Sequence, residues 1–100
     1  MFDVTNLHAL ITGTTSGFGE HFGRFLAGKG ARVTLTGRRT ERLEDLSNEL
    51  QIAGAQVQAV QLDVQDQTSV TDCFAQATDG FGCPDIVINN AGITVHGVTT

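Results

Sequence analysis

The chain has 100 residues and a formal net charge of −5, with 40% hydrophobic and 17% charged residues, which predicts one soluble globular domain over residues 1–100. The acidic balance argues against a nucleic-acid backbone or an anionic membrane as the main partner, because both attract clustered lysine and arginine. No apolar run reaches the length of a membrane span and no basic leader opens the chain, so we expect a cytoplasmic protein.

The first two elements are predicted from an apolar run and a helical repeat. Residues 7–12 (LHALIT) are typical of a strand buried on both faces. The next apolar residues recur at i, i+4, i+7 and i+8, which predicts a helix with this stripe in the core. The stripe consists of Phe18, Phe22, Phe25 and Leu26. Gly28 and Gly30 are expected to end the helix.

A second strand and a second helix follow. Residues 32–37 (RVTLTG) are short and rich in β-branched side chains, as in a strand. A leucine repeat then predicts a helix, with Thr40 at the N-cap position and Gly54 at the end. The leucines of this repeat are Leu43, Leu46 and Leu50.

The last third of the chain continues the alternation. We expect a strand over residues 56–64, a helix capped by Asp66, a strand over residues 85–90 and a loop over residues 91–100. The inward stripe of this helix is predicted to be Val70, Phe74 and Ala77, and two glycines, Gly80 and Gly82, to end it. Strands that alternate with helices in units of this size indicate an α/β protein with parallel strands and right-handed crossovers.

A glycine cluster lies at the junction of the first strand and the first helix. It fits the pattern T-G-x-x-x-G-x-G over Thr12, Gly13, Thr14, Thr15, Ser16, Gly17, Phe18 and Gly19, and fits neither the Walker pattern nor G-x-G-x-x-G. A strand that ends in such a turn and opens a helix presents free backbone N–H groups that bind phosphate. The sequence therefore predicts a phosphate-binding turn at this point.

Three further motifs accompany the glycines in order: LTGRR (35–39), LDV (62–64) and NNAG (89–92). With them the whole chain resembles the short-chain dehydrogenase/reductase family. The resemblance implies a Rossmann-like, doubly wound parallel sheet, here truncated to strands 3-2-1-4 with three crossover helices. It also implies the N-terminal, cofactor-binding part of a longer oxidoreductase that transfers a hydride between NADP(H) and a small carbonyl or alcohol substrate.

The same resemblance assigns cofactor-binding residues, grouped by the part of the dinucleotide they would contact. The pyrophosphate turn would comprise Gly13, Thr15, Ser16, Gly17, Phe18 and Gly19. The adenine site would comprise Asp63 and Val64, and the ribose beside the nicotinamide would contact Asn90, Ala91 and Gly92. Where an NAD-selecting member carries a carboxylate this chain has Gly37, followed by Arg38 and Arg39. Arginine suits a 2′-phosphate, so we expect NADP, with NAD as the alternative.

Catalytic residues cannot be carried over from the family. Its proton transfer uses a tyrosine tuned by a lysine, but this chain has no tyrosine, and its only lysine is Lys29. Alternative interpretations are a stand-alone nucleotide-binding module and a truncated product without function. The parent enzyme is expected to be a homo-oligomer. The shortened sheet is expected to leave residues 85–90 as an open edge, so that the isolated chain is marginally stable or aggregates.

The remaining candidates for chemistry are two cysteines and three histidines. Cys73 and Cys83 have no ligand-like neighbours, which predicts two free thiols in a reducing compartment. His8, His21 and His96 show no metal-ligand spacing, so we predict no metal site, and His21 is expected to face solvent.

Overall fold

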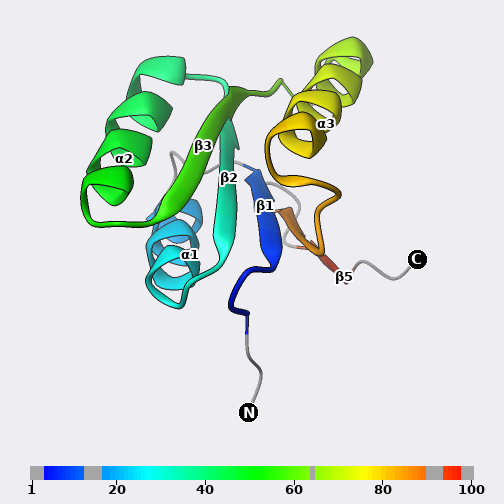
Figure 1. The fold of residues 1–100 in the computed structure, drawn as a ribbon. Helices are drawn as coiled ribbons and strands as arrows, with labels where there is room; N and C mark the ends of the chain where they lie inside the picture. The colour runs from blue at the N-terminus through cyan, green and yellow to red at the C-terminus, as the bar shows by residue number, and fades with distance from the viewer. Residues whose placement is uncertain (1–3, 13–16, 64, 90–93, 98–100) are drawn as a thin grey trace.

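The computed structural model describes residues 4–12, 17–63, 65–89 and 94–97. Strands and helices alternate along this part of the chain, as the sequence predicts (Figure 1). The elements are β1 (His8–Thr12), α1 (Gly17–Gly28), β2 (Arg32–Gly37), α2 (Thr40–Ile52), β3 (Gln56–Gln61), α3 (Gln67–Phe81), β4 (Ile86–Asn89) and β5 (Thr94–Gly97).

The strands form one sheet in the order β3-β2-β1-β4-β5, and β1 to β4 are parallel. The predicted order 3-2-1-4 is therefore confirmed. Leu10 on the central strand pairs with Thr34 of β2 on one side and with Val87 of β4 on the other. Helices α1 and α2 cover one face of the sheet and α3 covers the other, which is the doubly wound arrangement (Figure 1).

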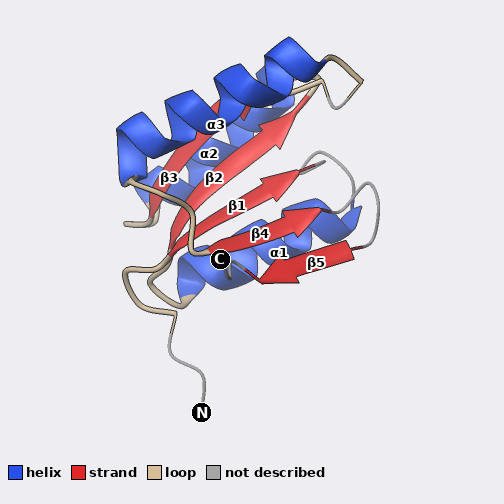
Figure 2. Cartoon of the chain, turned by 90° about the vertical axis from the view of Figure 1, so that its right-hand side faces the viewer, coloured by secondary structure: helices blue, strands red, loops and turns tan. Residues whose placement is uncertain are grey.

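Strand β5 was not predicted, because residues 91–100 were expected to form a loop. Thr94–Gly97 instead pairs antiparallel with β4, with Ile88 opposite Val95 (Figure 2). The backbone groups along this side of β4 therefore have partners, and the expected open edge at residues 85–90 is wrong. A run of four residues carries too little periodicity to be recognised without its partner strand.

The main core lies between the sheet and the α1/α2 layer, and the predicted leucine stripe of α2 is confirmed there. Its members from α2 are Leu43, Leu46 and Leu50, and its members from the strands include Ala9, Ile11, Val33, Leu35 and Val57. A smaller cluster lies between β3 and α3 and contains Val60, Leu62 and Cys73, with Val70 packed against it.

The predicted stripe of α1 is confirmed at Leu26 but wrong at Phe22 and Phe25. Phe22 and Phe25 are 38% and 54% exposed, whereas the buried positions are Gly19, Gly23, Leu26 and Ala27. Both sets have the same spacing, so the helix is turned by about 100° from the expected orientation. Small residues on the buried face allow a close approach of helix and sheet, and bulky phenylalanines would hold the two apart.

The predicted stripe of α3 is confirmed at Ala77, and Val70 packs against the buried cluster. Phe74 is instead 36% exposed, and Cys73 takes the buried position. The predicted cap of this helix is confirmed, because the Asp66 side chain accepts from the N–H groups of Thr68 and Ser69. At α2 the N-cap is Arg39, without a side-chain cap bond, and the expected cap residue Thr40 is the first residue of the helix.

Two glycines end α1 and α2 in the same way. Gly30 and Gly54 have positive φ angles of 88° and 98°. The N–H of each bonds three residues back, and the next residue, Ala31 or Ala55, bonds five residues back. This pair of bonds is the Schellman motif, which places each following strand directly beside the helix end.

Candidate functional site

The carboxyl ends of β1 to β4 lie along one edge of the sheet, because these strands are parallel (Figure 2). The chain leaves β1 toward α1 on one face, and α3 on the other face leads into β4. Successive strands are thus added on one side of β1 up to β3 and then on its other side with β4. In open α/β sheets, ligands bind outside the carboxyl ends of the strands at such a switch point. The predicted glycine turn follows β1 at this position.

Four groups of predicted residues follow these four strand ends. The described members are Gly17, Phe18 and Gly19 in the first turn of α1, Arg38 and Arg39 after β2, and Asp63 after β3. The other predicted residues lie outside the described part of the chain: Gly13, Thr15, Ser16, Val64, Asn90, Ala91 and Gly92. The topology thus places described members of the predicted groups after three of the parallel strands, β1, β2 and β3.

The start of α1 supplies main-chain donors at this edge. The helix begins at Gly17, so the first N–H groups of this helix have no carbonyl partner within the helix. The acidic residue of the first turn, Glu20, forms an ion pair with Arg24, with 3.0 Å between the guanidinium Nη2 and the carboxylate. The positive end of the helix dipole and these donors can therefore serve an anion.

Three arginines surround one hollow beside the end of β2. The hollow has a volume of about 430 Å³ and is lined by Arg38, Arg39, Glu41 and Arg42. All three arginine side chains are exposed, and none of them forms an ion pair with a residue in the described ranges. Sequence reasoning did not single out Arg42. Its position three residues after Arg39, one helical turn away, was the available signal.

Asp63 is held by its own turn. Its N–H donates to Ser69 Oγ at 2.9 Å, and its Oδ1 accepts from the N–H of Gln65 at 3.0 Å. The N–H of Leu62 donates to the carbonyl of Gly37 at 2.9 Å, which ties the end of β3 to the end of β2. Asp63 therefore follows a strand end that is tied to the end of β2. The residue is half-buried, and its Oδ2 has no hydrogen bond to a described residue.

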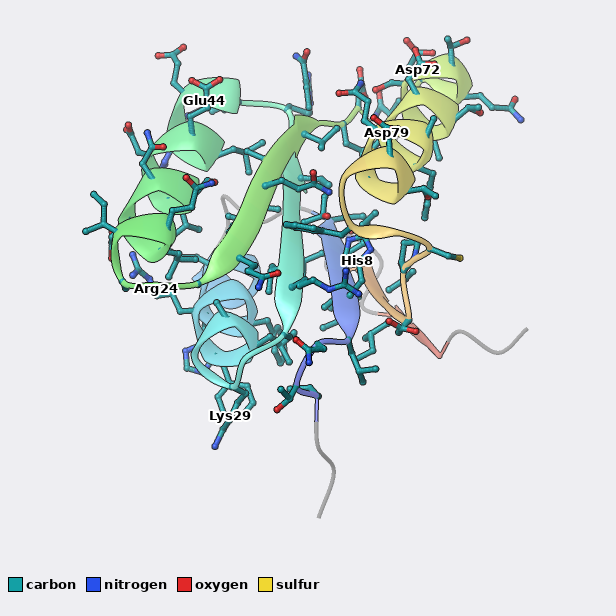
Figure 3. All side chains as sticks on the ribbon, in the orientation of Figure 1. His8, Arg24, Lys29, Glu44, Asp72 and Asp79 are labelled. Atoms are coloured by element: carbon teal, nitrogen blue, oxygen red, sulfur yellow. The ribbon has the colours of Figure 1, made fainter. Side chains whose placement is uncertain are left out.

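A buried polar network lies around His8, at the other end of the strands. His8, at the start of β1, is fully buried, and burial lowers its pKa below the usual 6.5. Its ring, labelled in Figure 3, is nearly perpendicular to that of Phe81, with 5.4 Å between the ring centroids. His8 thus belongs to the packing of α3, away from the candidate site, whereas His21 is exposed as expected.

Other kinds of site find little support. Among the described residues no three histidine, cysteine, aspartate or glutamate side chains gather as metal ligands. Cys73 and Cys83 are free thiols, as predicted. The helices within the described ranges are all too short or too polar to cross a membrane.

Comparison with known proteins adds to this geometry. Residues 7–100 match the family model of short chain dehydrogenases. The chain belongs to the short-chain dehydrogenase family. It is 43% identical over 86 residues to a serine 3-dehydrogenase of Rhizobium radiobacter, covering 86% of this chain and 33% of that protein. It is 38% identical over 86 residues to the NADP-dependent 3-hydroxy acid dehydrogenase YdfG of Shigella flexneri, covering 86% and 34%.

Solved structures of short-chain dehydrogenases share the fold. One from Burkholderia phymatum in complex with NAD is 31% identical, with a TM-score of 0.82 over 87% of this chain and 31% of its own. An actinorhodin polyketide ketoreductase with NADPH is 32% identical, with a TM-score of 0.80 over 84% of this chain and 32% of its own. The chain spans about a third of the length of these relatives.

Proposed function

We propose that this chain forms the cofactor-binding part of an NADP(H)-linked oxidoreductase that acts on a small carbonyl or alcohol substrate. The observation that supports the proposal is that the start of α1, the arginine turn and Asp63 follow three neighbouring parallel strands, β1, β2 and β3, at one edge of the sheet. A dinucleotide cofactor contains a pyrophosphate, a ribose and an adenine. The start of α1, the arginine turn and Asp63 each offer a binding partner for one of these three parts.

The described residues fit such a cofactor. The N–H groups of Gly17–Gly19, which have no carbonyl partner within the helix, suit the pyrophosphate, since a helix N-terminus attracts negative charge. Asp63 Oδ2 suits the adenine amino group, because a carboxylate only accepts hydrogen bonds. Arg38 and Arg39 suit a 2′-phosphate, because guanidinium groups bind phosphate through paired, charge-assisted bonds. When bound, the cofactor supplies the hydride, and the chain's residues hold and orient it.

Cofactor preference tests the arginine assignment. Titration of the full chain with NADPH and with NADH, followed by reduced-nicotinamide fluorescence, should show at least tenfold tighter binding of NADPH. Arg38→Gln and Arg39→Gln should each weaken NADPH binding by about tenfold and leave NADH binding nearly unchanged, since a charged hydrogen bond contributes about 1.5–3 kcal/mol. Equal affinity for the two nucleotides in the unaltered protein would refute the NADP proposal.

The phosphate turn has its own test. Gly17→Val should weaken NADPH and NADH alike, because a branched side chain would intrude where the backbone approaches the pyrophosphate. Gly28→Val is the matched control, since a Cβ at Gly28 meets open space at the far end of the same helix. If both variants bind NADPH as well as the original protein does, the pyrophosphate lies elsewhere.

A second candidate function is a nucleotide-binding module without catalysis. Its support is that the described groups would hold a dinucleotide without taking part in proton transfer. The two candidates differ in turnover. A module would bind NADPH but would not oxidise it with any panel of aldehydes, ketones or 3-oxo acids, whereas the proposed oxidoreductase part would support oxidation once the whole enzyme is assayed.

A further inference from the structure

Helix α3 is attached to the sheet by different kinds of contact in its two halves. In the first half, Cys73 belongs to the apolar cluster that the helix shares with β3. In the second half Ala77 is buried, but residues 78–80 are exposed and Phe81 is half-buried. The end of α3 is therefore held largely by hydrogen bonds and ring contacts, and much less by apolar packing.

These hydrogen bonds converge on His8 of the central strand β1. The ring Nδ1 lies 2.8 Å from the carbonyl oxygen of Gly82, the residue that follows α3. The ring Nε2 lies 2.6 Å from Thr34 Oγ1 on β2. The amide of Gln58 on β3 donates to that oxygen at 2.8 Å and to the carbonyl of Ala77 at 3.2 Å. One titratable ring is thus common to the bonds that hold the end of α3.

The groups around the ring leave a positive charge on it without a direct partner. Arg32 on β2 disfavours a charged ring, and Asp85 before β4 favours one. The Asp85 carboxylate, however, accepts from the main-chain N–H of His8 at 2.8 Å. Toward the ring, β3 presents the uncharged amide of Gln58 and α3 presents the ring of Phe81. Among the described residues, no carboxylate is hydrogen-bonded to a ring nitrogen of His8.

Protonation of His8 would break this arrangement. Nε2 would become a donor, so the Thr34 hydroxyl would lose the acceptor that the neutral ring provides. A full positive charge would also lie in a fully buried ring, which is costly. Strand β1 cannot move to relieve the cost, because it pairs with β2 on one side and β4 on the other. The end of α3 can move, because its attachment is this network, between the cluster at Cys73 and the buried Pro84.

We propose that His8 is a pH-dependent latch, whose protonation releases residues 77–82 at the end of α3 while the cluster at Cys73 and the sheet stay in place. The latch is independent of the proposed cofactor. Burial lowers the pKa of the closed ring below the ordinary 6.5, whereas water reaches the ring in the released state. The released state therefore binds a proton first, and its population increases as the pH falls below about 6.5.

Hydrogen exchange of the full chain at pH 7.5 and pH 5.5, corrected for intrinsic exchange rates, tests the latch. The opening constant of residues 77–82 should rise about 3- to 10-fold at pH 5.5, because one proton contributes at most about tenfold per pH unit. Low concentrations of urea should hardly change this opening, since a local release exposes little surface. Amides of α2 should exchange more slowly and depend steeply on urea. Equal protection and equal urea dependence in the two segments would overturn the proposal.

Two variants test whether His8 is the titrating group. His8→Gln should abolish the pH response of residues 77–82, whereas His21→Gln, an exposed control, should keep it. Phe81→Ala is the second variant, because Phe81 is only half-buried. It should let water reach the closed ring, speed exchange of residues 77–82 at pH 7.5 and reduce the pH response to less than about twofold. A full pH response in Phe81→Ala, or in a folded His8→Gln, would refute the latch.

Discussion

The ring of His8 on β1 and the hydroxyl of Thr34 on β2 are joined by a 2.6 Å hydrogen bond at the centre of a buried network. The ring Nδ1 lies 2.8 Å from the carbonyl oxygen of Gly82, which can only accept, so Nδ1 carries the proton. Nε2 therefore accepts from Thr34 Oγ1. That oxygen in turn accepts from Gln58 Nε2 at 2.8 Å. The network links β1, β2 and β3 to the end of α3, and every bond in it is satisfied by a neutral imidazole, the form that burial favours.

The first prediction is that His8 makes folding pH-dependent. Burial, the largest cause, lowers the pKa of His8 in the folded chain below the 6.5 of the unfolded chain. The unfolded chain therefore binds a proton first on acidification, and the free energy of unfolding falls as the pH drops from about 6.5 through the folded pKa. Urea unfolding at pH 7.5 and pH 5.5 should show this loss. His8→Gln should reduce it, at a cost of about 1–3 kcal/mol at pH 7.5.

His21→Gln is the matched control for this measurement, because His21 is exposed. It should keep the pH dependence of the unaltered protein and cost little stability. If His21→Gln and His8→Gln lose the same amount of pH dependence, His8 is not the group responsible.

The second prediction concerns Gly80, which lies against the same network. A Cβ at Gly80 would collide with the side-chain amide of Gln58, which donates to Thr34 Oγ1 and to the carbonyl of Ala77. Gly80→Ala should therefore lower the free energy of unfolding by about 1–2 kcal/mol, although alanine is the better helix former. Chemical denaturation followed by circular dichroism measures the change.

Gly28→Ala is the control for Gly80→Ala, because a Cβ at Gly28 in α1 has no atom within 4 Å. It should be neutral or slightly stabilising. The double variant Gln58→Ala/Gly80→Ala removes the collision and should be less unstable than the sum of the two single variants. Additive losses of unfolding free energy would show that a collision with Gln58 does not cause the loss in Gly80→Ala.

The fold was predictable where a residue's local chemistry determines its structure. Gly30 and Gly54 end helices because positive φ favours glycine, and Asp66 caps α3 through its own carboxylate. The orientation of α1 was not predictable in this way. Hydrophobicity favoured the phenylalanines, but the distance between helix and sheet, a tertiary property, placed Gly19 and Gly23 inside.

In the candidate site, too, the local features could be predicted from the sequence and the features that depend on tertiary packing could not. The glycine turn and the arginines are local motifs, and the parallel topology inferred from alternation places them at one edge. Arg42 was missed because the sequence alone does not show which side chains line the hollow after β2. The polar network of His8 was missed for a similar reason, since Thr34 and Gln58 are distant in sequence.

The third prediction separates two adjacent residues of α1. Leu26 is 8% exposed in the core, whereas Phe25 is 54% exposed with Lys29 Nζ 5.5 Å from its ring centre. Leu26→Ala should lower the free energy of unfolding by about 2–4 kcal/mol. Phe25→Ala should cost less than about 1 kcal/mol, although it removes the larger side chain. A larger loss in Phe25→Ala than in Leu26→Ala would mean that the phenylalanine stripe is the buried face of α1.

The fourth prediction is that the two thiols differ in reactivity. Cys73 is fully buried in α3, and burial raises its pKa to about 11, so about 0.1% of it is thiolate at pH 8. Cys83 is exposed. A thiol reagent should therefore label one site per native chain rapidly and the second only as fast as the chain opens. Cys83→Ser should abolish the rapid phase and leave the slow one, because the remaining thiol lies between α3 and β3. Rapid labelling of Cys83→Ser would contradict this prediction, because it would mean that α3 separates from the sheet in the native protein. The hydrogen bonds of the His8 network to the end of α3 would then be broken as well.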